Sequence, residues 1–218
     1  MNRGIAAVCC LALLLIFQAR TSPLSVIALG VMNPGASGVP SGWQVKVVHG
    51  KPDVSGCQES DKLCVHLRSR SSSFSLERSV EVNPAETPYL SWRWKVTRLP
   101  EGGDFRKAAT DDQAAQVLVV FTDRRVLSYI WDSNAPKGTT RKAGAPPLVH
   151  VVAVVCESGA SEANQWLEET RNVAEDYERS FGRPAPAIKG LRLQINSQHT
   201  GTLAESYFGE VAFRSSPE

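Results

Sequence analysis

The chain after residue 42 alternates between short runs rich in apolar and β-branched residues and breaks made of glycine, proline and asparagine. Ten of these runs have the length and composition of β-strands. They cover residues 43–48, 63–69, 74–82, 89–98, 114–122, 126–132, 148–156, 165–173, 188–196 and 206–214. Because no helical segments alternate with them, the pattern predicts an all-β fold, an antiparallel β-sandwich, rather than a parallel α/β sheet.

One segment has helical rather than strand periodicity. Val173, Tyr177 and Phe181 are spaced four residues apart, which would place their side chains on one face of a helix. Asn172 is suited to cap the first turn and Gly182 to follow the last one. The sequence therefore predicts one short connector helix over residues 173–181.

The strand over residues 89–98 has the clearest two-sided pattern. Trp92 and Trp94 fall on one face because successive side chains alternate, and basic residues fall on the other. Residues 188–196 alternate in the same way. We therefore expect a core face anchored by the two tryptophans and a polar face on which a ligand could bind. The polar side chains assigned to that face are Arg93, Lys95, Gln116, Arg192 and Gln194.

Two other runs, residues 117–121 and 149–155, are apolar on both faces. Such runs are typical of central strands that are covered on both sides. His150 lies in the second run, and we expect it to be an interior residue rather than a ligand of a metal. Trp43 and Trp166 are likewise expected in the core.

The N-terminal residues have the pattern of a secretory signal. Arg3 precedes an uninterrupted apolar run over residues 5–17, which is too short to span a bilayer because about 20 residues are needed. Cleavage could follow Ala19 or fall near Ala28, whereas the apolar residues 26–32 could retain the segment as a membrane anchor. A buried N-terminal helix is the alternative. We expect an exported, periplasmic or secreted protein with a signal peptide over 1–19 (or to 28), a linker over 20–42 and one domain over 43–218.

The remaining cysteines suit an oxidising compartment. Cys57 and Cys64 are close enough in sequence to form a disulfide that closes a small loop. Cys156 ends a valine-rich run and is expected to be a small buried residue. The absence of a CxxC motif or a Cys/His cluster argues against a structural zinc site.

Charge and motifs exclude several functions. The net charge is +2, from 24 basic and 22 acidic residues, and no basic stripe indicates a nucleic-acid partner. The chain has no GxSxG, phosphate-binding or GxGxxG motif, and its four histidines fit no metal-hydrolase spacing. Contact with a membrane is expected only through an uncleaved signal segment.

Asp111 and Asp112 directly precede a predicted central strand. Paired carboxylates in such a position can bind a ligand or hold calcium together with turn carbonyls. Adjacent strand residues point to opposite faces, which disfavours a proton shared between these two carboxylates. The alternative is that they accept hydrogen bonds from the local backbone or pair with an arginine.

Two further clusters combine charged and aromatic residues. Arg171 is suited to a bidentate contact with a carboxylate, and Asp176, next to Tyr177, is its candidate partner. This cluster is either a structural ion pair or the edge of a binding site. Trp131 and Asp132 end a strand, and an aromatic ring beside a carboxylate is typical of sugar sites, although the ring could equally belong to the core.

Several segments together resemble an uncharacterised bacterial family, DUF3047. They are residues 91–96 (SWRWKV), 110–115 (TDDQAA), 127–131 (LSYIW), 169–177 (ETRNVAEDY) with 181–182 (FG), and 207–211 (YFGEV). They occur in the expected order and cover most of the chain after residue 40. The resemblance implies a secreted or periplasmic β-sandwich and brings no established activity.

Two positions depart from the family pattern. Gln116 stands where the family tends to carry an arginine, and residues 196–200 (NSQHT) stand where it tends to carry an acidic turn. More loosely, the layout resembles carbohydrate-binding jelly rolls, which share an opening Gly-Trp strand and a final strand such as residues 207–213. That resemblance concerns the fold, and a fold does not define a function.

The polar face and the missing catalytic motifs favour an exported, non-catalytic binding module for a glycan or other anionic ligand. An envelope assembly factor that pairs through a sheet edge is one alternative. A glycan hydrolase or lyase that uses the carboxylates at 111, 112, 132 and 176 is another. The residues predicted to bind the ligand are Arg93, Lys95, Asp111, Asp112, Gln116, Asp132, Arg171, Asp176, Tyr177 and Arg192. Nothing in the sequence indicates the oligomeric state.

Overall fold

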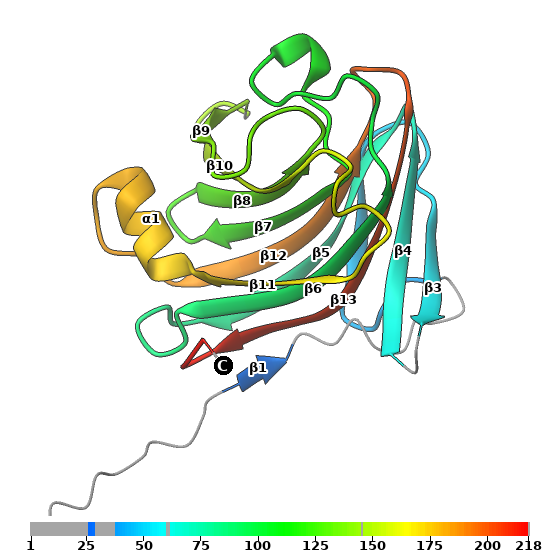
Figure 1. The fold of residues 1–218 in the computed structure, drawn as a ribbon. Helices are drawn as coiled ribbons and strands as arrows, with labels where there is room; N and C mark the ends of the chain where they lie inside the picture. The colour runs from blue at the N-terminus through cyan, green and yellow to red at the C-terminus, as the bar shows by residue number, and fades with distance from the viewer. Residues whose placement is uncertain (1–25, 29–37, 60–61, 145, 218) are drawn as a thin grey trace, which may run out of the picture.

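The protein is a two-layered β-sandwich in the computed structural model, which describes residues 26–28, 38–59, 62–144 and 146–217 (Figure 1). Sheet I has the strand order β11 (Leu167–Asn172), β6 (Tyr89–Arg98), β13 (Leu203–Arg214), β4 (Lys62–Arg70) and β3 (Val54–Glu59), and β1 (Val26–Ala28) pairs with the end of β13. Sheet II has the order β2 (Gln44–His49), β5 (Ser73–Val82), β12 (Ile188–Asn196), β7 (Ala115–Phe121), β8 (Arg125–Asp132), β10 (His150–Ser158) and β9 (Thr140–Ala143).

The predicted fold class is confirmed, and so are the bounds of β6, β12 and the helix α1 (Val173–Phe181). Three strands that the sequence did not predict, β1, β3 and β9, are short, and each is stabilised by pairing with a longer neighbour. One pair also differs from the antiparallel prediction. Strands β8 and β10 run parallel, because β9 and its flanking loops bring the chain back to the start of β8.

Aromatic side chains fill the space between the sheets. Trp92 and Trp94 of β6 are almost fully buried, as the strand pattern predicted. Their partners, Tyr129 and Trp131, both lie on β8. The Trp92 ring stacks on Tyr129 with ring centroids 5.2 Å apart, and the ring centroids of Trp94 and Trp131 are 5.8 Å apart. Aromatic pairs of this kind add to the energy of burial itself, so β6 and β8 fix the distance between the two sheets.

The strands predicted to be covered on both faces are covered. Beyond the main core, Ile130, Ala153 and Val155 pack under Phe105 and Ala135 on the outer side of sheet II. The loops that carry Phe105 and Ala135 therefore shield this part of β8 and β10 from water. One residue contradicts the prediction for this region: His150 is exposed, because it is the first residue of β10.

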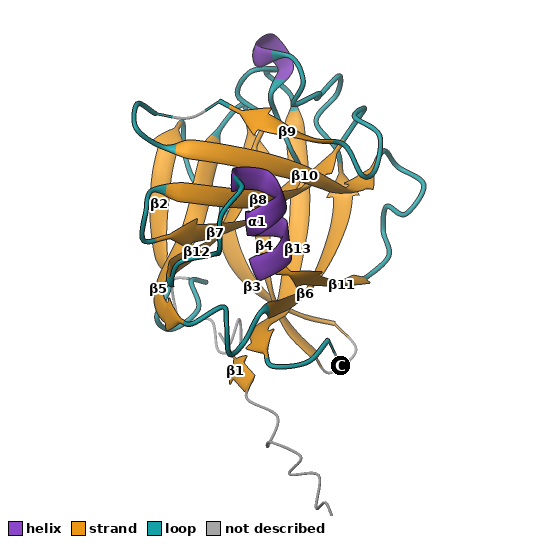
Figure 2. Cartoon of the chain, turned by 90° about the vertical axis from the view of Figure 1, so that its left-hand side faces the viewer, coloured by secondary structure: helices purple, strands orange, loops and turns teal. Residues whose placement is uncertain are grey.

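Helix α1 covers one end of the sandwich (Figure 2). Its buried Tyr177 packs against Phe121 with ring centroids 4.4 Å apart. Asn172 caps the helix by accepting a hydrogen bond from the Glu175 backbone N–H at 3.2 Å, and Gly182 ends it with a φ of 69°. Both termini are thus set by the residues that the sequence identified.

The polar face predicted from strand parity is divided between two sheets. Arg93 and Lys95 lie on the outer face of sheet I, whereas Gln116, Arg192 and Gln194 belong to sheet II. The prediction of a single groove was therefore wrong, because parity identifies the face of a strand but not the sheet that contains it.

The cysteine predictions are confirmed, since Cys57 and Cys64 form a disulfide and Cys156 is free and buried. The predicted signal peptide over residues 1–19 lies outside the described residues. Cleavage near Ala28, the alternative, would separate β1 from the domain. Among the described residues, no helix is both long and apolar enough to cross a membrane.

Candidate ligand-binding face

The outer face of sheet I carries two aromatic rings among charged side chains. Trp166 precedes β11, and Tyr207 lies on β13, where it pairs in register with Lys95 of β6. The two rings are 6.5 Å apart and nearly perpendicular. We call this surface the Trp166 face, and it consists of Glu59, His66, Arg93, Lys95, Trp166, Glu168, Glu205 and Tyr207.

Cations hold the rings of the Trp166 face in place. The Lys95 ammonium lies 4.3 Å from the centroid of Tyr207 and 5.4 Å from that of Trp166, and the Arg93 guanidinium lies 5.0 Å from Trp166. Lys95 is only 8% exposed, so its contacts with the rings are largely shielded from water. Cation–π contacts are stronger when desolvated, so these rings are well fixed.

Carboxylates pair with each cation of the Trp166 face. Glu59 of β3 accepts a hydrogen bond from Lys95 at 2.5 Å and another from the Trp166 indole N–H at 3.0 Å. The bond from Lys95 is the main reason why the pKa of Glu59 is lowered. Glu168 forms an ion pair with Arg93 at 3.1 Å and stays largely exposed. The face therefore presents donors and acceptors next to its aromatic rings.

His66 completes the Trp166 face on β4. Its ring stacks on Tyr207 with centroids 4.1 Å apart, and burial lowers its pKa, so the ring is neutral at pH 7. Its Nε2 is buried and has no hydrogen-bond partner among the described residues, although Glu205 lies 3.8 Å away. Neutral His66 therefore extends the aromatic surface.

Backbone features bring these side chains close together. Gly209 lies in the bulge of β13 and has no side chain. A Cβ at this position would lie 3.3 Å from the Arg93 Cβ and 3.6 Å from the Trp166 ring. On the other side, the disulfide between Cys57 and Cys64 joins β3 to β4 two residues before Glu59. Glycine at 209 thus admits the aromatic ring, and the disulfide holds the strand that carries Glu59.

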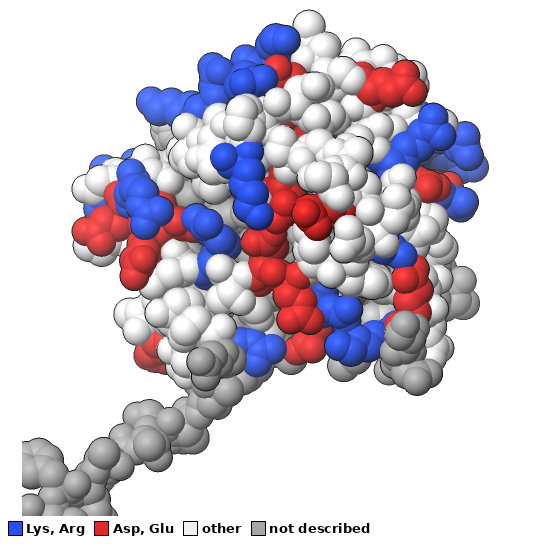
Figure 3. All heavy atoms as spheres, in the orientation of Figure 1, with Lys and Arg blue, Asp and Glu red and all other residues white. Residues whose placement is uncertain are grey.

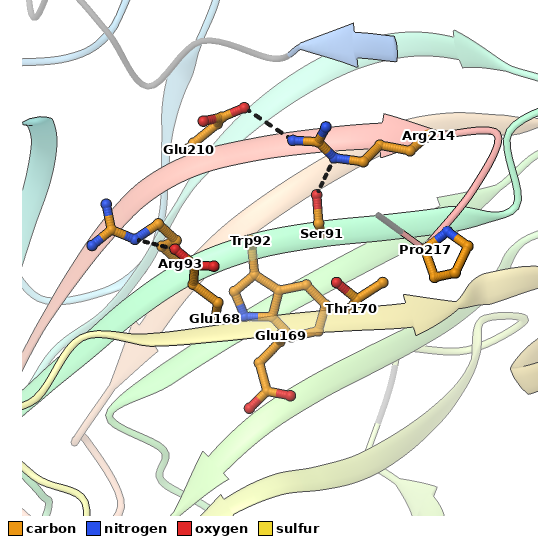
Figure 4. Close-up of a pocket in the computed structure, with 9 residues that line it drawn as sticks. All are labelled: Ser91, Trp92, Arg93, Glu168, Glu169, Thr170, Glu210, Arg214 and Pro217. Atoms are coloured by element: carbon orange, nitrogen blue, oxygen red, sulfur yellow. Dashed lines mark hydrogen bonds and ion pairs between the residues drawn. The ribbon is translucent and has the colours of Figure 1, made fainter. Parts of the chain in front are cut away.

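A groove of about 290 Å³ continues from Arg93 across β6, β11 and β13 (Figure 4). Arg214 donates a hydrogen bond to Ser91 at 2.9 Å and pairs with Glu210 at 3.2 Å along one side. The residues that line the groove are Ser91, Trp92, Arg93, Glu168, Glu169, Thr170, Glu210, Arg214 and Pro217. Because Arg93 belongs to both, the groove and the Trp166 face form one continuous surface.

A pair of carboxyl groups lies where the two sheets meet at β10 and β11. Glu157 is 7% exposed, forms an ion pair with Lys137 at 2.5 Å and shares a hydrogen bond with Glu169. Burial, together with the neighbouring Glu157, raises the pKa of Glu169 to about 7. Figure 3 shows acidic side chains in a band down the middle of this view of the molecule. No local sequence pattern indicates this pair, since its two residues lie on strands from different sheets.

The predicted pairing of Arg171 with Asp176 is present as a structural cluster. Arg171 binds both oxygens of Asp176 at 2.9 Å, and the buried hydroxyl of Tyr129 donates to the same carboxylate at 2.9 Å. Tyr177 instead donates to Asp123, and burial raises its pKa to about 12. These contacts tie α1 to β8 and β11.

Asp112 anchors a buried polar network. It is fully buried and accepts hydrogen bonds from Asn196 and from the backbone of His199 and Thr200, while Gln116 donates to Asn196 at 2.7 Å. The two positions that depart from the family pattern, Gln116 and residues 196–200, are therefore in contact. The described residues contain no group of three or more metal-ligating side chains, and the calcium prediction at Asp111 and Asp112 stays a prediction.

Asp111 and two other predicted binding residues have local partners as well. Asp111 accepts a hydrogen bond from Gln113 at 2.9 Å, and burial raises its pKa. Asp132 is fully buried and accepts from three backbone N–H groups at 2.7–2.9 Å. Arg192 forms an ion pair with Glu77 at 3.2 Å on sheet II. Of the predicted ligand-binding residues, the structure thus places only Arg93 and Lys95 on the Trp166 face.

Trp166 was predicted to lie in the core, and that prediction was wrong. The residue is half-buried on the outer face, because Leu167 rather than Trp166 shares the inward parity of Trp94. Glu59, His66 and Glu168 were not identified from the sequence at all. Strand parity around residue 166 was the one signal that could have found this site.

The fold and this site define a jelly-roll-type β-sandwich with an aromatic and charged patch on the outside of one sheet. Within that class, the chain belongs to the DUF3047 family, whose description is a protein of unknown function and whose sequence profile matches residues 41–212. No curated protein sequence matches the chain significantly.

Solved structures with a similar fold share about a tenth of their residues with this chain. The xyloglucanase domain of NopAA, a type three effector from Sinorhizobium fredii in complex with cellobiose, is 10% identical with a TM-score of 0.50, over 79% of this chain and 92% of that one. An endoglucanase from Rhodothermus marinus is 9% identical with a TM-score of 0.48, over 87% and 99%. A family 11 carbohydrate-binding module of a Clostridium thermocellum cellulase is 9% identical with a TM-score of 0.46, over 88% and 95%. At 10% identity, the likeness to the xyloglucanase domain shows the fold alone.

Proposed function

We propose that this protein is an exported, non-catalytic module that binds a glycan across the Trp166 face. The observation that carries the proposal is the pair of rings, Trp166 and Tyr207, with ion-paired side chains around them. Sugar rings have an apolar face that stacks on aromatic side chains, and their hydroxyl groups both donate and accept hydrogen bonds. The pairs Arg93–Glu168 and Lys95–Glu59 offer both kinds of group.

The Trp166 face is arranged before a ligand arrives. The indole N–H of Trp166 already donates to Glu59, and two cations lie over its ring. A preorganised surface loses little side-chain entropy on binding, which favours affinity. The groove of about 290 Å³ beside Arg93 extends this surface and is a candidate site for a further part of the ligand. The export part of the proposal rests on the N-terminal apolar run.

Binding can be tested with envelope and extracellular polysaccharides on an array, followed by calorimetry with the best soluble oligomer. Cellobiose and its longer oligomers are suitable first probes, since cellobiose is bound in the similar xyloglucanase domain. We expect Trp166→Ala to weaken binding about tenfold or more, and Trp166→Phe to keep most of it, because stacking rather than the N–H supplies the energy.

A matched control is available on the other sheet. Glu77→Gln removes the ion pair to Arg192, at 3.2 Å, just as Glu168→Gln removes the pair to Arg93, at 3.1 Å. Only the Glu168 variant should lose affinity. Absence of binding to every glycan, or equal effects of the two variants, would contradict the proposal. Release of new reducing ends would contradict its non-catalytic part.

A further inference from the structure

The loop between β9 and β10 exposes an apolar tip. Leu148 is 72% exposed, more than any other large apolar residue described, and Pro146 and Pro147 beside it are exposed too. The φ of Leu148 is 67°, a left-handed backbone conformation that is unfavourable for leucine. The turn is closed by a hydrogen bond from the Val149 N–H to the Pro146 carbonyl at 3.1 Å. A strained backbone conformation at an exposed residue motivates a hypothesis of function.

Basic side chains surround this tip. Arg141 and Lys142 of β9 are exposed, and so is Arg124, whose carbonyl accepts a hydrogen bond from His150 at 3.1 Å. Within the described part of the chain, none of these three cations has an ion-pair partner; Arg141 donates only to a backbone carbonyl at 3.4 Å. Figure 3 shows basic side chains gathered at the upper left, where Figure 1 places β9.

A cavity of about 310 Å³ lies directly behind the tip. It is lined by Arg125, Lys142, Ala143, Val149, His150, Val151, Val152, Ser180 and Phe181. No carboxylate is among these lining residues. Asp123 forms an ion pair with only one of their basic side chains, Arg125, at 2.6 Å. The basic side chains and the Ser180 hydroxyl of this lining, next to valine and phenylalanine side chains, match the chemistry of an anionic lipid headgroup.

We propose that the loop around Leu148, with residues 141–144 and 146–150, docks the protein on the surface of an anionic phospholipid bilayer. Leu148 enters the interface while Lys142 and Arg141 contact headgroup phosphates, and one phosphate occupies the cavity behind them. We prefer a bilayer to a protein partner, because an exposed apolar side chain and exposed cations together suit an interface that has both acyl chains and phosphates. The loop belongs to sheet II, so this contact leaves the Trp166 face of sheet I free.

Hydrogen exchange of the full chain with vesicles gives a local test. Vesicles of phosphatidylglycerol and phosphatidylcholine should protect residues 141–150, whereas phosphatidylcholine alone should not. Strand β2, whose Val48 is also 68% exposed, should stay unchanged in both. The readout is local, so binding of the apolar N-terminal residues to either vesicle does not obscure it. Equal protection by both vesicles, or none by the anionic one, would overturn the proposal.

Matched variants measure how much Leu148 and Lys142 contribute to vesicle binding. Leu148→Ser and Lys142→Glu should each weaken binding to anionic vesicles about tenfold, the first by removing apolar contact and the second by reversing a charge. Val48→Ser and Lys46→Glu make the same changes on β2 and should leave that binding intact. If all four variants bind alike, the tip is not the contact. If residues 141–150 are protected by polyglutamate and not by vesicles, an acidic protein partner replaces the bilayer.

Discussion

Asp176 shows how much a single buried carboxylate contributes to this fold. It is 5% exposed and receives hydrogen bonds from Arg171 on β11, Tyr129 on β8 and Arg179 on its own helix. A sequence reader can pair Arg171 with Asp176 because they lie five residues apart. The contribution of Tyr129 is not visible in the sequence, since it comes from the opposite sheet.

Two arginines bind Asp176, and their side chains differ in exposure to solvent, which allows a matched comparison. Arg171→Met should lower the free energy of unfolding by about 2–4 kcal/mol, because it removes a bidentate partner from a buried charge. Arg179→Met removes a partner whose side chain is 68% exposed and should cost less than about 1 kcal/mol. Urea unfolding of both variants checks this, and equal losses would contradict the structural role of Arg171.

Glu169 predicts a pH dependence of stability. Its pKa is raised to about 7 in the folded protein, so the folded state keeps a proton that the unfolded chain loses near pH 4.5. The contribution of Glu169 to the free energy of unfolding is therefore fully present below about pH 4.5 and is lost as the pH rises through 7. Glu169→Gln should flatten this fall, by on the order of 1–3 kcal/mol. Urea unfolding at pH 5 and pH 8 tests it, and an unchanged slope would contradict the assignment.

Among the elements, β13 has the backbone feature on which the Trp166 face depends. Its bulge places Gly209 against Arg93 and Trp166. Gly209→Ala should force these side chains apart, lower stability by about 1 kcal/mol and weaken glycan binding. Gly190→Ala, where the nearest atoms are 3.6 Å away, is the matched control and should do neither. Calorimetry and thermal unfolding distinguish the two; equal effects would mean that close approach at 209 is unimportant.

The elements also show what the sequence could and could not predict. Strands β6 and β12 and helix α1 were predicted with their bounds, because each combines a strong periodic pattern with clear breakers or caps. The outward direction of Arg93 and Lys95 followed from the same parity. The short strands β3 and β9 could not be found, since pairing with neighbours rather than local composition forms them.

For the candidate site, the limit was long-range assembly. The Trp166 face brings together β3, β4 and β6, which lie within residues 54–98, with Trp166 and β13 from much later in the chain. Glu59 meets Trp166 across 107 positions, and no local pattern records that contact. The residues with the strongest local motifs, Asp112 and Asp132, turned out to hold turns in place.

At the scale of the whole molecule, the two proposed surfaces belong to different sheets. The Trp166 face lies on sheet I, and the Leu148 loop joins two strands of sheet II. With the core between them, we expect their effects to be additive. A Trp166→Ala variant should keep its preference for anionic vesicles, and Leu148→Ser should keep its affinity for the glycan. Measuring both properties in both variants checks this, and strong coupling would indicate one shared site.

The most direct test of the central claim is the indole N–H spectrum of the five tryptophans during a glycan titration. Trp43, Trp92, Trp94 and Trp131 are buried, so only Trp166 can stack on a ligand. Binding at the Trp166 face predicts that the Trp166 resonance shifts most and in proportion to occupancy. A bound glycan that leaves this resonance unchanged, while signals from sheet II move, would contradict the account.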